Sequence, residues 1–172
     1  VITSLYLDHI TILGDTLEQI AREKGGIIKP GIPVVSAPQE AEALGVLQSL
    51  AEEHQAPLLV VGRDYRYQIT SRSLEGQKFV VSRPGKEIQL EIPLIGDYQV
   101  INGVTAYAAL DVLRKSGWKL DQDQIVEGFK KTSWPARFEI LRRDPPLIID
   151  SAHNPASIQK LRETVDEFFP DL

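Results

Sequence analysis

The chain has 172 residues, of which 42% are hydrophobic and 25% are charged, a balance typical of a globular protein that buries one core or slightly more. The net charge of −5 and the scattered lysines and arginines form no basic stripe, which argues against a nucleic-acid partner. No apolar run reaches the roughly 18–20 residues of a membrane span, so we expect no membrane partner and a cytoplasmic location. The lack of cysteine excludes disulfides, thiolate metal sites and cysteine nucleophiles.

The first sixty residues predict a parallel βαβ unit. Three segments have the apolar composition of buried strands: residues 2–7, 32–36 and 58–61. Two segments carry apolar side chains at helical spacing: residues 17–25 and 38–54. The glycines at 25–26 predict the end of the first helix, where glycine permits a left-handed cap.

The composition then changes to that of a small antiparallel meander at residues 65–92, with turns at 74–76 and 84–85. Two further helices are predicted at residues 102–114 and 121–131. Two strands follow at residues 138–141 and 147–149. A polar segment at residues 150–154 then leads into a last helix at residues 155–169. This ending is typical of the opening of a second α/β domain.

His9 follows the first predicted strand, and Lys24 lies at the end of the first predicted helix. A neutral imidazole at the carboxyl end of a parallel strand can ligate a metal, because open α/β sheets bind ligands outside those ends. The alternative is a histidine in a surface loop and a solvated lysine favoured by the helix dipole.

The sequence around this pair, LDHITILGDTLEQIAREKGGIIKPGIP at residues 7–33, resembles that of folylpolyglutamate and dihydrofolate synthases. These enzymes belong to the wider Mur ligase superfamily, and their pattern is Asp-His, Leu-Gly-x-Thr, Ile-Ala-x-Glu-Lys and Gly-Ile-x-Lys-Pro-Gly. Gly26 stands where the family usually has alanine. The resemblance implies that His9 coordinates a second magnesium ion and that Lys24 is carbamylated, so that it becomes an oxygen ligand suited to a hard cation.

A second segment, LIGDYQVIN at residues 94–102, resembles the family's Leu-x-Gly-x-His-Gln-x-x-Asn-Ala-Ala. The resemblance implies that Asn102 binds adenine, and a carboxamide can donate to and accept from the adenine edge at once. The alternative is that Asn102 only caps a helix. Tyr98 replaces the usual histidine and Gly103 the usual alanine.

A third segment, WPARFE at residues 134–139, resembles the family's Pro-Gly-Arg-x-Glu linker. The resemblance implies that Arg137 reaches the ATP phosphates, and a guanidinium is always charged and can grip two phosphate oxygens. The alternative is an ordinary surface arginine.

A fourth segment, DSAHNP at residues 150–155, is similar to the family's Asp-Gly-Ala-His-Asn-Pro. The resemblance implies that Asp150 accepts from the ribose hydroxyls and that His153 lies near the ATP phosphates. The alternative is an Asx turn that caps the last helix.

The resemblance implies an α/β fold in two parts. Residues 1–133 are expected to be the later part of a P-loop-NTPase-like Mur ligase central domain on a parallel sheet, with the antiparallel meander at 65–92. Residues 134–137 are the expected interdomain linker. Residues 138–172 are expected to be the first strands and helix of a Rossmann-like C-terminal glutamate-ligase domain.

By resemblance, the parent enzyme uses ATP and two magnesium ions to add L-glutamate to a folate or dihydropteroate carboxylate through an acyl phosphate. No G-x-x-x-x-G-K-[ST] loop occurs in the chain, which lacks methionine, and we expect that loop in a missing N-terminal part. Two alternatives stay open: a Mur-type ligase of UDP-linked peptides, and a non-catalytic nucleotide-binding domain. The sequence does not distinguish dihydrofolate synthase from folylpolyglutamate synthase.

Overall fold

The computed structural model describes residues 1–7 and 14–170. The chain forms two compact units, each made of two segments. The first unit combines Val1–Arg66 with Val104–Lys119, and the second combines Tyr67–Gly103 with Leu120–Leu172.

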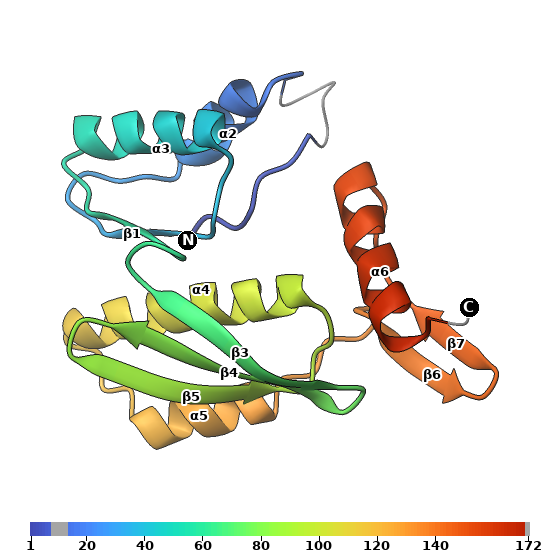
Figure 1. The fold of residues 1–172 in the computed structure, drawn as a ribbon. Helices are drawn as coiled ribbons and strands as arrows, with labels where there is room; N and C mark the ends of the chain where they lie inside the picture. Colours follow the sequence, from blue (N-terminus) through green and yellow to red (C-terminus); the bar gives the residue numbers. More distant parts are fainter. Residues whose placement is uncertain (8–13, 171–172) are drawn as a thin grey trace. The chain divides into compact units, whose positions relative to one another are not determined.

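The first unit contains the predicted parallel βαβ unit. Its elements follow the chain in the order α2 (Leu17–Gly25), β1 (Val34–Ser36), α3 (Ala41–Glu53) and β2 (Leu58–Val60) (Figure 1). Strands β1 and β2 pair in parallel, with Val35 opposite Leu59. The α/β prediction for this part of the chain is confirmed.

Helices α2 and α3 pack closely in this unit, and glycine makes the approach possible. The side chain of Thr16 caps α2 by accepting from the backbone N–H of Gln19 at 3.3 Å. A Cβ atom at Gly25 would overlap the side chain of Leu50 on α3. Buried apolar residues form the core here: Ile2, Ala21, Ile28, Val34, Ala43, Leu47 and Ala56.

Helix α2 ends at Gly25 as predicted, but without the left-handed cap that its glycines permit. Gly26 has φ −58° and ψ −12°, and its N–H donates to the carbonyl of Glu23, so the chain leaves the helix through a right-handed turn. The glycine at position 25 leaves space for the Leu50 side chain, and the glycine at position 26 does not use a positive φ.

The predicted opening strand at residues 2–7 is also wrong. Of these residues, Ile2 forms a bridge to Ser36, whereas the backbone groups of Thr3 and Leu5 form hydrogen bonds with a side chain. The amide of Gln39 donates to the carbonyl of Thr3 at 2.8 Å and accepts from the N–H of Leu5 at 2.9 Å. A side-chain amide thereby replaces the ladder that a strand would need.

The second unit is built on the predicted meander, β3 (Arg66–Ser73), β4 (Gly76–Arg83) and β5 (Lys86–Ile92), in that order across the sheet. Strands β4 and β5 are antiparallel, with Phe79 opposite Leu90. Helix α5 (Gln122–Lys130) packs on β5, and its N-cap is Asp121, as the sequence predicts. Helix α4 (Asp97–Lys115) starts in this unit and ends in the first one.

The C-terminal part of the second unit is a hairpin followed by a helix. Strands β6 (Glu139–Arg143) and β7 (Pro146–Ile149) pair in antiparallel register, and α6 (Pro155–Phe168) follows (Figure 1). Asn154 and Ser157 form a capping box at the start of α6. The predicted linker at 134–137 lies within this unit, and its role as a domain boundary stays a prediction.

Within the described residues, none of the helices combines the length and the hydropathy that a membrane crossing requires.

Candidate functional site

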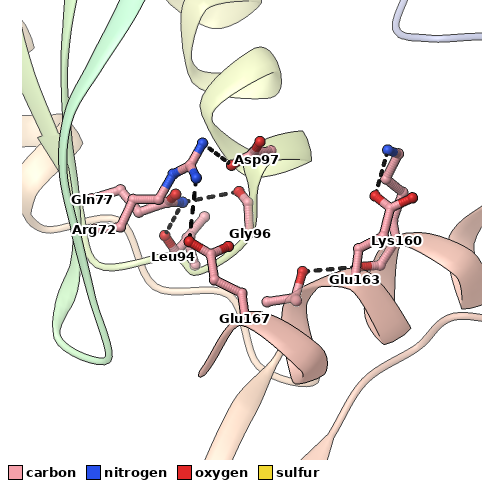
Figure 2. Close-up of polar contacts among 9 residues, drawn as sticks. Arg72, Gln77, Leu94, Gly96, Asp97, Lys160, Glu163 and Glu167 are labelled. Carbon is pink, nitrogen blue, oxygen red and sulfur yellow. Dashed lines mark hydrogen bonds and ion pairs between the residues drawn. The ribbon is translucent and has the colours of Figure 1, made fainter. Parts of the chain in front are cut away.

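A buried glutamine fixes the segment that leads into α4. Gln77 on β4 is 1% exposed, and its amide nitrogen donates to the carbonyls of Leu94 and Gly96, both at 2.9 Å (Figure 2). Gly96 has φ +101°, a conformation that favours glycine. The turn that opens the predicted adenine motif is therefore held by one buried side chain.

Asn102 lies on the second turn of α4, which begins five residues earlier than predicted. The helix-cap alternative for Asn102 is wrong, because the helix already begins at Asp97. The Asn102 side chain is exposed and its amide nitrogen lies 3.4 Å from the Oε1 of Gln99. An exposed carboxamide on the first half of α4 remains able to bind a ligand.

Arg137 lies between two residues in the left-handed region. Ala136 has φ +58° and Phe138 has φ +45°. The Ala136 N–H donates to Oε2 of Glu139 at 2.8 Å, and the Ala136 carbonyl accepts from the N–H of Ser151 at 2.9 Å. Arg137 itself is partly buried, and its guanidinium has no hydrogen-bond or ion-pair partner among the described residues.

The carboxylate of Asp150 ties this linker to the fourth motif. Its Oδ2 accepts from the N–H of Phe138 and its Oδ1 from the N–H of Ala152, both at 2.7 Å. A carboxylate offers about four acceptor positions, so these two bonds leave capacity for further donors such as hydroxyl groups. The Asx-turn alternative for the motif is present at Asp150 alongside the linker contact, and the cap of α6 is Asn154.

His153 is exposed at the start of α6. Its Nδ1 lies 2.9 Å from the carbonyl of Ser151, and its backbone N–H donates to the hydroxyl of Ser157 at 3.1 Å. If Nδ1 carries the proton, the other ring nitrogen is an acceptor that faces away from this carbonyl.

Tyr98 joins the adenine motif to Asp150. The Tyr98 hydroxyl lies 3.5 Å from Oδ2 of Asp150, across 52 positions of the sequence. Burial and the negative charge of Asp150 raise the pKa of Tyr98 to about 12, while the nearby Arg137 acts in the opposite direction. Three of the four sequence motifs thus meet within the second unit.

An arginine that the sequence reasoning missed links three elements of this unit. Arg72 on β3 lies 2.7 Å from the carboxylate of Asp97, the first residue of α4, and 3.2 Å from that of Glu167 in the last turn of α6 (Figure 2). Gln77 was also missed. Buried and less buried residues alternate along the first half of β4, and Gln77 stands at a buried position, which is a signal that the sequence could have given. Arg72 has no such signal, because partners 25 and 95 residues away appear only in the fold.

The first motif is described only in part. His9 lies outside the described residues, and Lys24 is exposed in the last turn of α2. Within residues 1–7 and 14–170, no three histidine, aspartate or glutamate side chains cluster as metal ligands. An ammonium group alone does not bind a cation, so the described donors do not by themselves fit magnesium.

Comparison with known proteins gives the family. Residues 1–110 match the sequence profile of the Mur ligase middle domain. The chain is 37% identical over 98% of its length to the dihydrofolate synthase/folylpolyglutamate synthase of Bacillus subtilis. It is 35% identical to the folylpolyglutamate synthase of Lacticaseibacillus casei and 32% identical to the Escherichia coli dihydrofolate synthase/folylpolyglutamate synthase.

Solved structures agree with this result. An FPGS–AMPPCP–folate complex superposes on 96% of the chain with a TM-score of 0.90 at 33% identity. The Mycobacterium tuberculosis folylpolyglutamate synthase, complexed with ADP and AMPPCP, covers 98% with a TM-score of 0.84 at 29% identity. The chain spans 41% and 39% of those two structures, and 40% of the B. subtilis and L. casei relatives. The predicted resemblance is confirmed, and the chain belongs to the Mur ligase family, whose middle domain its first 110 residues match.

Proposed function

We propose that the full-length protein containing this chain is an ATP-dependent ligase that joins L-glutamate to the carboxylate of a folate or of dihydropteroate. One observation supports the proposal above all: the adenine, linker and ribose motifs converge through the contacts of Tyr98, Phe138 and Ser151 with Asp150 and Ala136. The names of the relatives point to the same activity. The cytoplasm stays the proposed location.

In the proposed reaction, an oxygen of the substrate carboxylate attacks the terminal phosphorus of ATP, and ADP leaves. The amine of L-glutamate then attacks the acyl carbon of the acyl phosphate, inorganic phosphate leaves, and the nitrogen loses a proton. Positioning and charge stabilisation carry most of the catalysis in phosphoryl transfer.

Four residues of the chain have a proposed role in holding ATP. The Asn102 amide reads the adenine edge, and the remaining acceptor positions of Asp150 receive ribose hydroxyls. The Arg137 guanidinium grips phosphate oxygens, and His153 lies near them at the start of α6. The exposure of Asn102 and His153 and the unpaired guanidinium of Arg137 are compatible with these roles.

Magnesium is proposed from the resemblance alone. His9, with Lys24 as its carbamate, would hold a second ion beside one bound outside this chain, where the ions would neutralise charge on the transferred phosphoryl group. Lys24 without its carbamate does not fit the magnesium ion. No step of the reaction described above depends on that ion.

The activity test uses the full-length protein with ATP and radiolabelled L-glutamate. We expect label in folate or in dihydropteroate, and the relative rates decide between folylpolyglutamate and dihydrofolate synthase. Transfer to a UDP-linked peptide instead would support the Mur-type alternative. ATP binding without transfer to any acceptor would support the non-catalytic alternative.

The site test compares two arginines. We expect Arg137→Ala to lower kcat/KM for ATP by about a hundredfold, the usual effect of removing a charge-stabilising donor. The matched control is Arg162→Ala, because Arg162 is 82% exposed on α6 and, among the described residues, its ion pair is the local one with Asp166. Equal kinetics of the two variants would contradict the assignment of Arg137.

A further inference from the structure

We propose that Glu139 is a positioning residue for Arg137. Its carboxylate holds the linker in the one backbone conformation that points the guanidinium toward the ATP phosphates. The inference rests on the proposed phosphate-binding role of Arg137. Neither the resemblance nor the names of the relatives assign a role to Glu139.

The conformation around Arg137 needs support from outside the linker. Ala136 and Phe138 both have φ in the left-handed region, at +58° and +45°. Residues with a Cβ atom adopt this region at a steric cost, and such strain persists only where surrounding contacts determine it. A free linker would relax to an extended or right-handed conformation and would turn Arg137 away.

Three hydrogen bonds supply that support, one to each successive peptide group around Arg137. The peptide before Ala136 donates to Glu139, the peptide between Ala136 and Arg137 accepts from Ser151, and the peptide after Arg137 donates to Asp150. Two peptide planes bracket each Cα atom. The bonds to Ser151 and Asp150 hold the two planes around Arg137, and the bond to Glu139, together with that to Ser151, holds the two planes around Ala136 and with them its positive φ.

Glu139 is well placed to act as such an anchor. It is the first residue of β6 and pairs with Ile149, the last residue of β7, directly before Asp150. The strand ladder therefore fixes the backbone of Glu139, and its partly buried carboxylate reaches back three residues to the Ala136 N–H at 2.8 Å. Hydrogen bonds between a carboxylate and a backbone N–H are stronger than neutral ones.

Direct charge pairing is a different role, and the geometry argues against it. Among the described residues, Glu139 and Arg137 form no ion pair, and the Glu139 carboxylate instead accepts a hydrogen bond from the backbone N–H of Ala136. Glu139 thus leaves the positive charge of Arg137 available for phosphate. The expected role is conformational, and the acceptor oxygen rather than the charge is what matters.

The test is a double-mutant cycle in the full-length protein, with kcat/KM for ATP as the readout. We expect Glu139→Ala to lower this value by about tenfold to a hundredfold, because a small misplacement of a catalytic group costs that much. In the Arg137→Ala background the same change should have almost no effect, since no guanidinium remains to be aimed. KM for L-glutamate should stay unchanged.

Two further variants separate positioning from folding. Glu139→Gln keeps an acceptor oxygen and should retain most of the activity. Adding Ala136→Gly to Glu139→Ala should recover part of the loss, because glycine adopts a positive φ without steric cost. The matched control is Glu127→Ala, since Glu127 is an exposed glutamate on α5 that pairs with Lys131, the residue that follows this helix.

The outcomes are distinguishable. If Glu139→Ala lowers kcat/KM by the same factor with and without Arg137, or if Glu139→Gln is as impaired as Glu139→Ala, the inference is overturned while the proposed function stands. If Arg137→Ala itself has normal ATP kinetics, the proposed role of Arg137 fails and the inference fails with it. Should Glu139→Ala not fold on its own, the cycle is measured with the double variant Glu139→Ala/Ala136→Gly, and a loss of kcat/KM that is the same with and without Arg137 overturns the inference there too.

Discussion

Single polar side chains hold the strained parts of this chain. Gln77 supports the turn before α4, and Asp150 and Glu139 support the linker around Arg137. The orientation of the Gln77 amide follows from its partners, because two carbonyls require the nitrogen. Its Oε1 is buried without a protein partner among the described residues, so this amide is present for its two donated bonds.

We predict that Gln77→Leu destabilises the second unit by about 1–3 kcal/mol. The change removes the donated bonds to the carbonyls of Leu94 and Gly96, although the Gly96 carbonyl keeps the N–H of Gln99. Part of the loss is offset because the unpaired Oε1 is removed as well. Urea denaturation measures the effect. Gln89→Leu is the matched control, because Gln89 is exposed on β5, and an equal loss there would contradict the prediction.

The phenol of Tyr98 leads to a prediction about pH. Its pKa is raised to about 12 in the folded protein, above the ordinary value of 10, so folding favours the protonated phenol. The stability that this phenol contributes is complete below pH 10 and is lost as the pH rises toward 12. Tyr98→Phe should abolish this loss in unfolding curves measured at pH 9 and above, and an unchanged pH dependence would refute the assignment.

At the scale of elements, the ion pairs of Arg72 connect β3, the start of α4 and the end of α6. All three side chains are at least one-third exposed, and exposed ion pairs contribute roughly 0.2–1 kcal/mol each. Their effect is therefore to restrict α6 locally rather than to determine whether the unit folds.

We predict that Arg72→Ala increases amide hydrogen exchange in α6 while it lowers the unfolding free energy by no more than about 1 kcal/mol. High salt should reproduce part of the effect in the unchanged protein, because it screens exposed charges. Arg162→Ala is the control, since the pair of Arg162 with Asp166 stays within α6. Equal exchange in the two variants would show that the link to β3 and α4 has no influence on α6.

At the scale of the whole molecule, we propose that the chain holds only a part of an ATP site. It spans about 40% of its B. subtilis and L. casei relatives, and its sequence contains no G-x-x-x-x-G-K-[ST] loop. The proposed adenine, ribose and phosphate contacts of this chain lack the backbone cradle that such a loop supplies.

We predict that the purified 172-residue chain has no ATP-dependent glutamylation activity. The assay is the one used for the full-length protein, with dihydropteroate and folate as acceptors. Product formation that depends on ATP would refute the prediction and would show that this chain carries a complete site.

The metal proposal is tested through Lys24 in the full-length protein. We predict that the full-length protein, incubated with ¹³C-labelled carbon dioxide, shows a carbamate signal by NMR that is absent in Lys24→Ala. Lys29→Ala is the matched control, because Lys29 is also an exposed lysine close to the end of α2. A signal that survives in Lys24→Ala would contradict the assignment.

The sequence by itself determined the local elements and the order of the motifs. Apolar spacing and capping residues predicted α2, α3, α5 and α6, because these signals act within one or two turns of a helix. Four motif matches in the same order identified the family.

Contacts between distant residues were decided only by the tertiary structure. Gln39 replaces the ladder of the expected first strand, and Asp150 binds a linker twelve residues before it. Arg72 finds a partner 95 positions away. A side chain that satisfies a distant backbone group leaves no periodic signal in the sequence. The Glu139 carboxylate binds only three residues back, but the sequence does not show the positive φ angles of Ala136 and Phe138, which only the folded linker reveals.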